Sequence, residues 1–160
     1  SYYGPSPVVG TFGIALLSRT PLLSPRTFYM YSEGEQTATI DAEIETATGR
    51  CRVLATHLGN GGPLVQQEAI LRALGSAENA ILMGDFNFRP ETEQYALTTQ
   101  TLVDAWASAG GQPDADWLDP ARRIDHIFVS PGVAVEEARY LDSAPSDHPP
   151  LLATVRCPGG

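Results

Sequence analysis

Four short polar groups in this 160-residue sequence border apolar runs and contain side chains that can do chemistry. They are Thr56-His57, Gly84-Asp85-Phe86-Asn87, Arg123-Ile124-Asp125-His126 and Ser146-Asp147-His148. Histidines and carboxylates carry most general acid–base catalysis, and carboxylates also bind hard cations. Each group alone has a structural explanation: a loop histidine, a surface ion pair or a turn before prolines. All four together favour a functional site.

The second group follows the apolar run at residues 81–83 and suits phosphate or metal chemistry. On an extended backbone Asp85 and Asn87 project to the same side, because side chains alternate along a strand. A carboxylate beside a carboxamide can hold a hard cation and also donate hydrogen bonds to a phosphate oxygen. An Asx turn at a strand end is the structural alternative. The presence of the other three groups favours the functional interpretation.

The elements that position these groups are predicted to be mostly strands. Hydrophobic patterns predict strands at 11–18, 37–45, 51–58, 80–86, 123–130, 133–141 and 151–155, and helices at 63–74, 91–98 and 102–107. The strand at 37–45 alternates strictly, so one face should be in water. A Pro-rich connection should precede it, and residues 110–120 and 144–150 should be polar loops. Hairpin-like links and few helices favour one α+β domain, residues 1–160, with antiparallel or mixed sheets.

The charge of the chain limits its partners. The net charge is −9, from 19 acidic residues against 10 basic ones that are all arginine. Such a surface repels a polyanion at long range, so a broad nucleic-acid footprint is disfavoured. A weak nuclease that contacts a few phosphates through Arg19, Arg89, Arg122 or Arg123 is compatible with this charge. Metal-assisted phosphate chemistry is also compatible, because a bound cation changes the local field.

Two further features concern redox state and location. Cys51 and Cys157 fall in predicted strands far apart in sequence, and buried free thiols are the default expectation. A disulfide requires those two strands to be neighbours. No apolar stretch approaches the length of a membrane span, and the start shows no basic-then-apolar signal segment. The sequence leaves localisation open.

The combination of motifs resembles the endonuclease/exonuclease/phosphatase superfamily of metal-dependent enzymes. The matching text is Gly13-Ile14-Ala15-Leu16-Leu17-Ser18-Arg19, Thr56-His57-Leu58, Gly84-Asp85-Phe86-Asn87, residues 123–130 and residues 146–151. The last three motifs in combination are highly specific. The resemblance implies a four-layered α/β sandwich with the active site at one edge. Residues 10–19 and 56–60 also look like a branch that includes a domain of proteins remodelling lipid anchors.

The resemblance implies a role for each matching residue. His148 would be the general base for the attacking water or a transition-state stabiliser, and Asp125 would orient it in one tautomer. Asp85 and Asn87 would bind the phosphate, a metal or the leaving group. His57 would donate to a non-bridging phosphate oxygen. Asp147 would be a metal ligand or lie behind one, and His126 is assigned to packing.

These roles imply a divalent-metal-dependent phosphoesterase, and favour a phosphodiesterase that acts on a lipid-linked, small-molecule or nucleic-acid substrate. The metal ligands would be Asp85, Asn87 and Asp147. The hard oxygen donors and the lack of thiolates in the motifs suit Mg²⁺ or Mn²⁺ better than zinc. The cation would polarise the phosphoryl group and neutralise the leaving oxygen. No basic amphipathic helix for a membrane surface is evident.

The sequence departs from the family pattern at its start. Family members begin with strands that carry an asparagine and a metal-ligating glutamate, and only ten residues precede Thr11 here. The chain therefore resembles the C-terminal two-thirds of a family domain. Three explanations are open: an excised fragment, which we favour; a product completed by a second chain; or a degenerate member. In the last case the alternative function is non-catalytic phosphate binding or scaffolding. If the chain is stable alone, the sheet edge and apolar face left without the leading strands would favour self-association.

Overall fold

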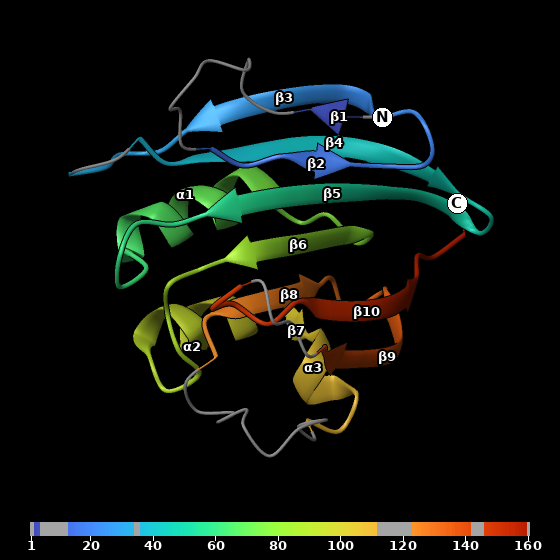
Figure 1. The fold of residues 1–160 in the computed structure, drawn as a ribbon. Helices are drawn as coiled ribbons and strands as arrows, with labels where there is room; N and C mark the ends of the chain where they lie inside the picture. Colours follow the sequence, from blue (N-terminus) through green and yellow to red (C-terminus); the bar gives the residue numbers. More distant parts are fainter. Residues whose placement is uncertain (1, 4–12, 34–35, 112–122, 142–145, 160) are drawn as a thin grey trace.

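The computed structural model describes residues 2–3, 13–33, 36–111, 123–141 and 146–159, and its centre is a six-stranded mixed sheet (Figure 1). The strand order is β3-β4-β5-β6-β8-β7, and only β5 and β6 run parallel. The bounds are β3 Leu23–Tyr29, β4 Ala38–Thr46, β5 Gly49–His57, β6 Ala80–Asp85, β7 Val103–Asp104 and β8 Asp125–Val129. This arrangement confirms the predicted mixed sheet.

Three helices and two small sheets complete the described structure. The helices are α1 Leu64–Leu74, α2 Glu93–Thr99 and α3 Ala105–Ser108. One small sheet pairs β1 (Tyr2–Tyr3) with β2 (Leu16–Leu17), and the other pairs β9 (Ala134–Tyr140) with β10 (Leu151–Arg156). In the described residues, no helix is both long enough and apolar enough to cross a membrane. These helices and small sheets can therefore pack against both faces of the central sheet.

The core lies on both faces of the central sheet. Alternate residues such as Leu54, Leu82 and Phe128 pack with Ile70 and Leu74 of α1. On the opposite face, a second cluster joins the sheet to β2, β9 and β10; its buried members include Leu16, Ile40, Val53, Ala55, Val129 and Val133. Strands β5, β6 and β8 therefore contribute alternate side chains to the two clusters. Burial on both faces holds the ends of β5, β6 and β8 in fixed register.

The structure corrects two expectations about the strands. The Pro-rich connection before residue 37 contains β3, whose residues pair with β4 from Tyr29↔Ala38 to Leu23↔Glu43 with a register shift. Pro25 lies where that register shifts, on the edge strand, which is where a sheet tolerates proline. The predicted strand at 11–18 is reduced to β2 in the described residues. Most of the loop predicted at 110–120, and residues 144–145 of the loop predicted at 144–150, lie outside the described residues.

The polar face of β4 is buried, so the predicted wet face is wrong for its first half. Asp41 is 3% exposed. Its carboxylate accepts from Arg26 and from Arg52 at 2.7–2.9 Å. Arg52 also donates to the carbonyls of Ala73 and Leu74 at the end of α1. Helix α1 covers this face, and the paired arginines make burial of the carboxylate acceptable.

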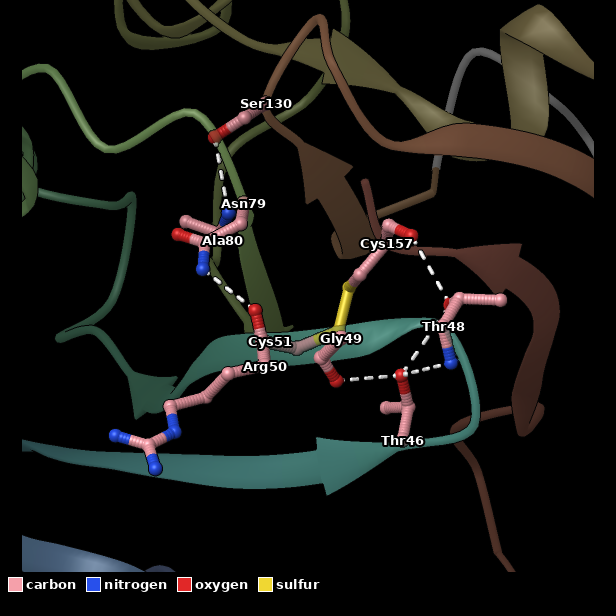
Figure 2. Close-up of a disulfide and its surroundings, with 9 residues drawn as sticks. All are labelled: Thr46, Thr48, Gly49, Arg50, Cys51, Asn79, Ala80, Ser130 and Cys157. Atoms are coloured by element: carbon pink, nitrogen blue, oxygen red, sulfur yellow. Dashed lines mark hydrogen bonds between the residues drawn. A yellow bond between two sulfur atoms is a disulfide. The ribbon is translucent and has the colours of Figure 1, made fainter. Parts of the chain in front are cut away.

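Cys51 and Cys157 form a disulfide, so the expectation of free thiols is wrong (Figure 2). Cys51 lies in β5 and Cys157 directly follows β10, and their Cα atoms are 6.0 Å apart. The Thr48 hydroxyl donates to the carbonyl of Cys157 at 3.0 Å. The pairing could not be predicted because no sequence pattern places the end of β10 over the start of β5.

Candidate active site

Strand register brings three of the predicted site residues into one row. His57 ends β5 and pairs with Asp85 at the end of β6, and Asp85 pairs with Asp125 at the start of β8. Neighbours across a sheet project from the same face. The face is the one that carries Val53 and Ala55 further along β5. Three groups that are distant in sequence therefore meet at one end of the sheet.

Gly84 allows this row to form, because β5 and β6 approach closely beside it. Gly84 has a φ of 147° and pairs with Thr56. A Cβ atom there would lie 1.9 Å from the carbonyl oxygen of Thr56. Only glycine fits both the backbone conformation and the space. The glycine of the Gly84-Asp85 motif thus sets the position of the carboxylate.

Asp85 and Asn87 come together through a turn and not along an extended strand. The strand ends at Asp85, and Asn87 has a φ of 53°, in the left-handed region that asparagine tolerates. The backbone N–H of Asn87 donates to Asp85 Oδ1 at 2.9 Å, which is an Asx turn. The side-chain amide donates to the carbonyl of Leu58 at 2.9 Å. The turn and the functional arrangement are therefore the same structure.

His57 completes this side of the site. Its Nε2 lies 3.3 Å from Asp85 Oδ2 and 3.3 Å from the amide nitrogen of Asn87. The loop that follows is tied to Gln66, whose Oε1 accepts from the N–H of Gly59 at 2.9 Å. His57 thus contacts both polar groups of the Asp85–Asn87 turn.

His148 and Asp125 form a hydrogen-bonded pair on the other side of Asp85. His148 Nδ1 lies 2.8 Å from Asp125 Oδ2 and 3.9 Å from Asp85 Oδ2. The N–H of His148 is held by the hydroxyl of Ser146 at 3.0 Å. Because Nδ1 faces the carboxylate as donor, Nε2 is left to accept a proton. This is the arrangement expected of a general base and its orienting carboxylate.

The electrostatics of this pair follow from burial and charge. Burial raises the pKa of Asp125, the charge of Asp85 raises it further, and the opposing attraction of His148 does not restore the usual value. Burial lowers the pKa of His148, but the Asp125 and Asp85 carboxylates outweigh it and leave this pKa above the ordinary histidine value. Both pKa values are thus raised: the protonated histidine is stabilised by the neighbouring carboxylates, and the ionised Asp125 is disfavoured by its burial.

A buried polar cluster lies behind the row. Asp104 and Arg123 form an ion pair at 2.6 Å with both side chains nearly inaccessible. Arg123 donates to Nδ1 of His126 at 3.1 Å, and His126 Nε2 donates to the carbonyl of Phe88 at 3.1 Å. His126 also stacks on Phe88 with ring centroids 5.5 Å apart. The packing role predicted for His126 agrees with these contacts, and the cluster links β8 to the segment after Asn87.

The residues present fit a hard cation. Donor atoms of Asp85, Asp125 and His148 lie within 4.8 Å of one another. Two of the three are carboxylates, the ligand type that Mg²⁺ and Mn²⁺ prefer. Asp125 and His148 already bond to each other, which leaves Asp85 as the carboxylate best able to bind metal. Asp147 is exposed and lies outside this group, so its role as a ligand stays a prediction.

The site residues line two hollows in the surface. Asp85, Asp125 and His148 line one of about 380 Å³. His57 and Asn87 line another of about 660 Å³. The 3.3 Å contact between His57 and Asp85 joins them.

The sequence matches one protein family across most of its length. A sequence model of the endonuclease/exonuclease/phosphatase family matches residues 1–148. The chain belongs to this family. A comparison with curated proteins gives no match. Enzymes of the family are generally hydrolytic, and typically depend on divalent metals.

Solved structures confirm the α+β fold of the endonuclease/exonuclease/phosphatase type. A family protein from Beutenbergia cavernae has a TM-score of 0.77 at 20% identity, covering 92% of this chain and 48% of that chain. A mannosyl-6-phosphatase from Bacteroides thetaiotaomicron has a TM-score of 0.72 at 19% identity, covering 90% and 70%. TDP2 from D. rerio, complexed with single-strand DNA product, has a TM-score of 0.70 at 17% identity, covering 98% and 76%. The chain thus spans about half the first protein.

Proposed function

We propose that this protein is a divalent-metal-dependent phosphodiesterase in which water attacks the phosphorus. The observation that carries the proposal is the 2.8 Å pair of Asp125 and His148 beside the carboxylate of Asp85. The family supplies the reaction class, hydrolysis of phosphate esters. We further propose that the substrate is a diester, whether lipid-linked, small-molecule or nucleic-acid.

His148 acts as the base in this proposal. Asp125 accepts from Nδ1, so Nε2 points away from it and can take a proton from water. The side chain is 38% exposed, which leaves room for a water molecule at the ring. The raised pKa strengthens the base but requires a pH above that pKa for the neutral form. Activity should therefore rise with pH through the titration of this histidine.

His57 and Asn87 act on the phosphate. His57 contacts both the Asp85 carboxylate and the side-chain amide of Asn87, and both His57 and Asn87 carry N–H groups. Donors placed where a phosphoryl oxygen gains charge stabilise the transition state more than the ground state. Their attachment to the ends of β5 and β6 keeps them in place without reorganisation. His57 is thus proposed as the donor to a non-bridging oxygen, with Asn87 beside it.

Asp85, Asn87 and Asp147 are the residues proposed to hold Mg²⁺ or Mn²⁺. Asp85 Oδ2 faces the site, and the Asn87 carboxamide lies within the same turn. When bound, the cation neutralises charge on the phosphoryl group and on the leaving oxygen. Asp147 is proposed because it precedes His148 on an exposed segment, from which a carboxylate can turn toward the site.

The test is hydrolysis of bis(p-nitrophenyl) phosphate with Mg²⁺ or Mn²⁺, before and after chelator. We expect metal-dependent turnover, a fall of about 10²–10⁴-fold in kcat for His148→Ala, and loss of metal dependence for Asp85→Asn. Glu45→Gln, an exposed carboxylate change on β4 away from the site, is the matched control. Near-normal turnover by His148→Ala would contradict the proposal. Phosphate binding without turnover in the unchanged chain would support the non-catalytic alternative.

A further inference from the structure

The hollow beside His57 and Asn87 has walls of a distinct chemical character. It has a volume of about 660 Å³, within the range of small-molecule pockets. Its described lining is Tyr31, Ser32, Glu33, Thr37, His57, Leu58, Gly59, Asn60, Pro63, Val65, Gln66 and Asn87. This lining contains no arginine, and its only acidic side chain is Glu33. The second ester group of a substrate has to fit such a surface.

The position of the hollow follows from the geometry of phosphoryl transfer. The attacking and leaving oxygens lie roughly in line on opposite sides of phosphorus. His57 ends the strand on one side of Asp85, and His148 bonds to Asp125 of the strand on the other side. With water on the His148 side, the leaving oxygen lies on the His57 side and its substituent points into the hollow.

The walls of the hollow indicate what that substituent is. Among the described lining residues, a second phosphate would meet Glu33 and no cation, which disfavours a polyanionic strand. The Tyr31 ring is 66% exposed, and its hydroxyl donates to Glu33 Oε1 at 3.2 Å. An aromatic face beside a carboxylate and the Asn60 carboxamide suits a ring that is apolar on its faces and carries hydroxyls at its edge. A hydrocarbon chain would offer no hydrogen-bonding group to Glu33 or Asn60.

The hollow is held in shape by a buried side chain. Gln66 is 1% exposed, donates to the carbonyl of Tyr31 at 2.8 Å and accepts from the N–H of Gly59 at 2.9 Å. It thereby joins the segment after β3 to the loop after β5, on the two sides of the hollow. The site is built before a ligand arrives, which reduces the cost of ordering it on binding.

We propose that this hollow, here named the Tyr31 pocket, binds the leaving group of the substrate, and that this group is an uncharged, hydroxyl-rich ring such as a sugar. The inference rests on the proposed function. The oxygen of water forms the new bond to phosphorus, and its proton passes to His148. The bond from phosphorus to the sugar oxygen breaks, and that oxygen keeps the electron pair and takes a proton from solvent water, to which His148 returns the proton that it accepted.

Binding tests the pocket separately from turnover. The probes are three phosphodiesters: glucose 6-(methyl phosphate), phenyl methyl phosphate, and a thymidine dinucleotide with an added terminal phosphate. Titration calorimetry with Mg²⁺ should show the glucose diester binding most tightly. Tyr31→Ala should weaken its binding about tenfold, the loss typical of one aromatic contact. Tyr29→Ala is the matched control, because Tyr29 is 72% exposed on the same segment and does not line the pocket.

Charge is tested by Glu33→Gln, which keeps the shape of the side chain. This change should raise affinity for the phosphorylated dinucleotide roughly fivefold and leave phenyl methyl phosphate unchanged. A sugar phosphodiester can also be a lipid headgroup, so cosedimentation with phosphatidylinositol vesicles distinguishes the sources. If the unchanged chain cosediments with the vesicles and Tyr31→Ala does not, the ligand is the lipid headgroup. Binding of the soluble diester alone assigns the free form.

The outcomes separate this inference from the proposed function. Equal binding of the glucose diester by the unchanged chain and Tyr31→Ala, or equal loss in Tyr29→Ala, overturns the pocket. Stronger binding of the dinucleotide also overturns it. If the unchanged chain binds the glucose diester most tightly and Tyr31→Ala weakens this binding, but no metal-dependent turnover is seen, the pocket is upheld and the enzyme proposal is overturned. If turnover depends on His148 but the three diesters bind equally, the enzyme proposal is upheld and the pocket proposal is overturned.

Discussion

Removing the charge of Asp104 should destabilise the fold strongly, because it leaves Arg123 charged and buried without its ionic partner. The two side chains are 2% and 3% exposed and their atoms are 2.6 Å apart. Breaking a buried ion pair from one side costs about 3–5 kcal/mol. Asp104→Asn is the suitable change, since Asp104 also caps α3 by accepting from the N–H of Ala107, and asparagine is an equally good cap.

The assay is equilibrium urea unfolding of Asp104→Asn, Arg123→Met and the double variant. We expect each single change to lower the free energy of unfolding by about 3–5 kcal/mol. The double variant should lose less than the sum, because no buried charge remains unpaired. The cation–π contact of Arg123 with Trp106, at 4.6 Å, would be lost in both variants that lack the arginine.

The pH dependence gives an independent check. Burial raises the pKa of Asp104, but the neighbouring His126 ring and Arg123 guanidinium outweigh it and hold this pKa well below its usual value. A depressed folded-state pKa adds stability above the unfolded-state value of about 4, and this is lost as pH falls toward the folded-state value. Asp104→Asn should therefore show a flatter loss of stability below pH ~4. Additive single changes, or a loss under about 1 kcal/mol for Asp104→Asn, would refute the reasoning.

Three further changes test other parts of the structure. Gly84→Ala should cost about 3 kcal/mol or more, seen as a lower Tm, because its Cβ would meet the Thr56 carbonyl; an unchanged Tm would contradict the close approach. Reducing the bond between Cys51 and Cys157 should cost about 2–4 kcal/mol in thermal unfolding with and without dithiothreitol, and equal melting would refute a stabilising disulfide. Asp125→Asn should lower kcat about 10²-fold and move the rising, acidic limb of the pH–rate profile to lower pH, since the Asp125 charge raises the pKa of His148; an unchanged profile would contradict that role.

The sequence predicts the site residues better than the way in which they meet. Thr56-His57, Gly84-Asp85 and Asp125 each border an apolar run, so their place at strand ends follows from pattern alone. Their alignment in one row depends on a parallel β5–β6 pair and an antiparallel β6–β8 pair. Such register is set by burial on both faces of the sheet, which local patterns do not contain. From the sequence alone, the turn at Asn87 is only an alternative to an extended backbone.

Other features depended on long-range contacts. Asp41 looks like a solvent-facing residue of an alternating strand, and only the approach of Arg26, Arg52 and helix α1 makes its burial possible. The sequence pattern does not predict strand β3, because Leu23–Tyr29 contains a proline and a serine, which edge strands tolerate. The Tyr31 pocket joins the segment after β3 to the loop after β5, about 30 residues apart in sequence. No local motif marks it.

The central claim is that the row of His57, Asp85 and Asp125, with His148, is a catalytic site. The most direct measurement compares initial rates of bis(p-nitrophenyl) phosphate hydrolysis with Mg²⁺ for the unchanged chain and His148→Ala, at matched concentration and with matched melting curves. The account predicts chelator-sensitive turnover in the first and a rate lower by about 10²-fold or more in the second. Equal rates in the two proteins would contradict it.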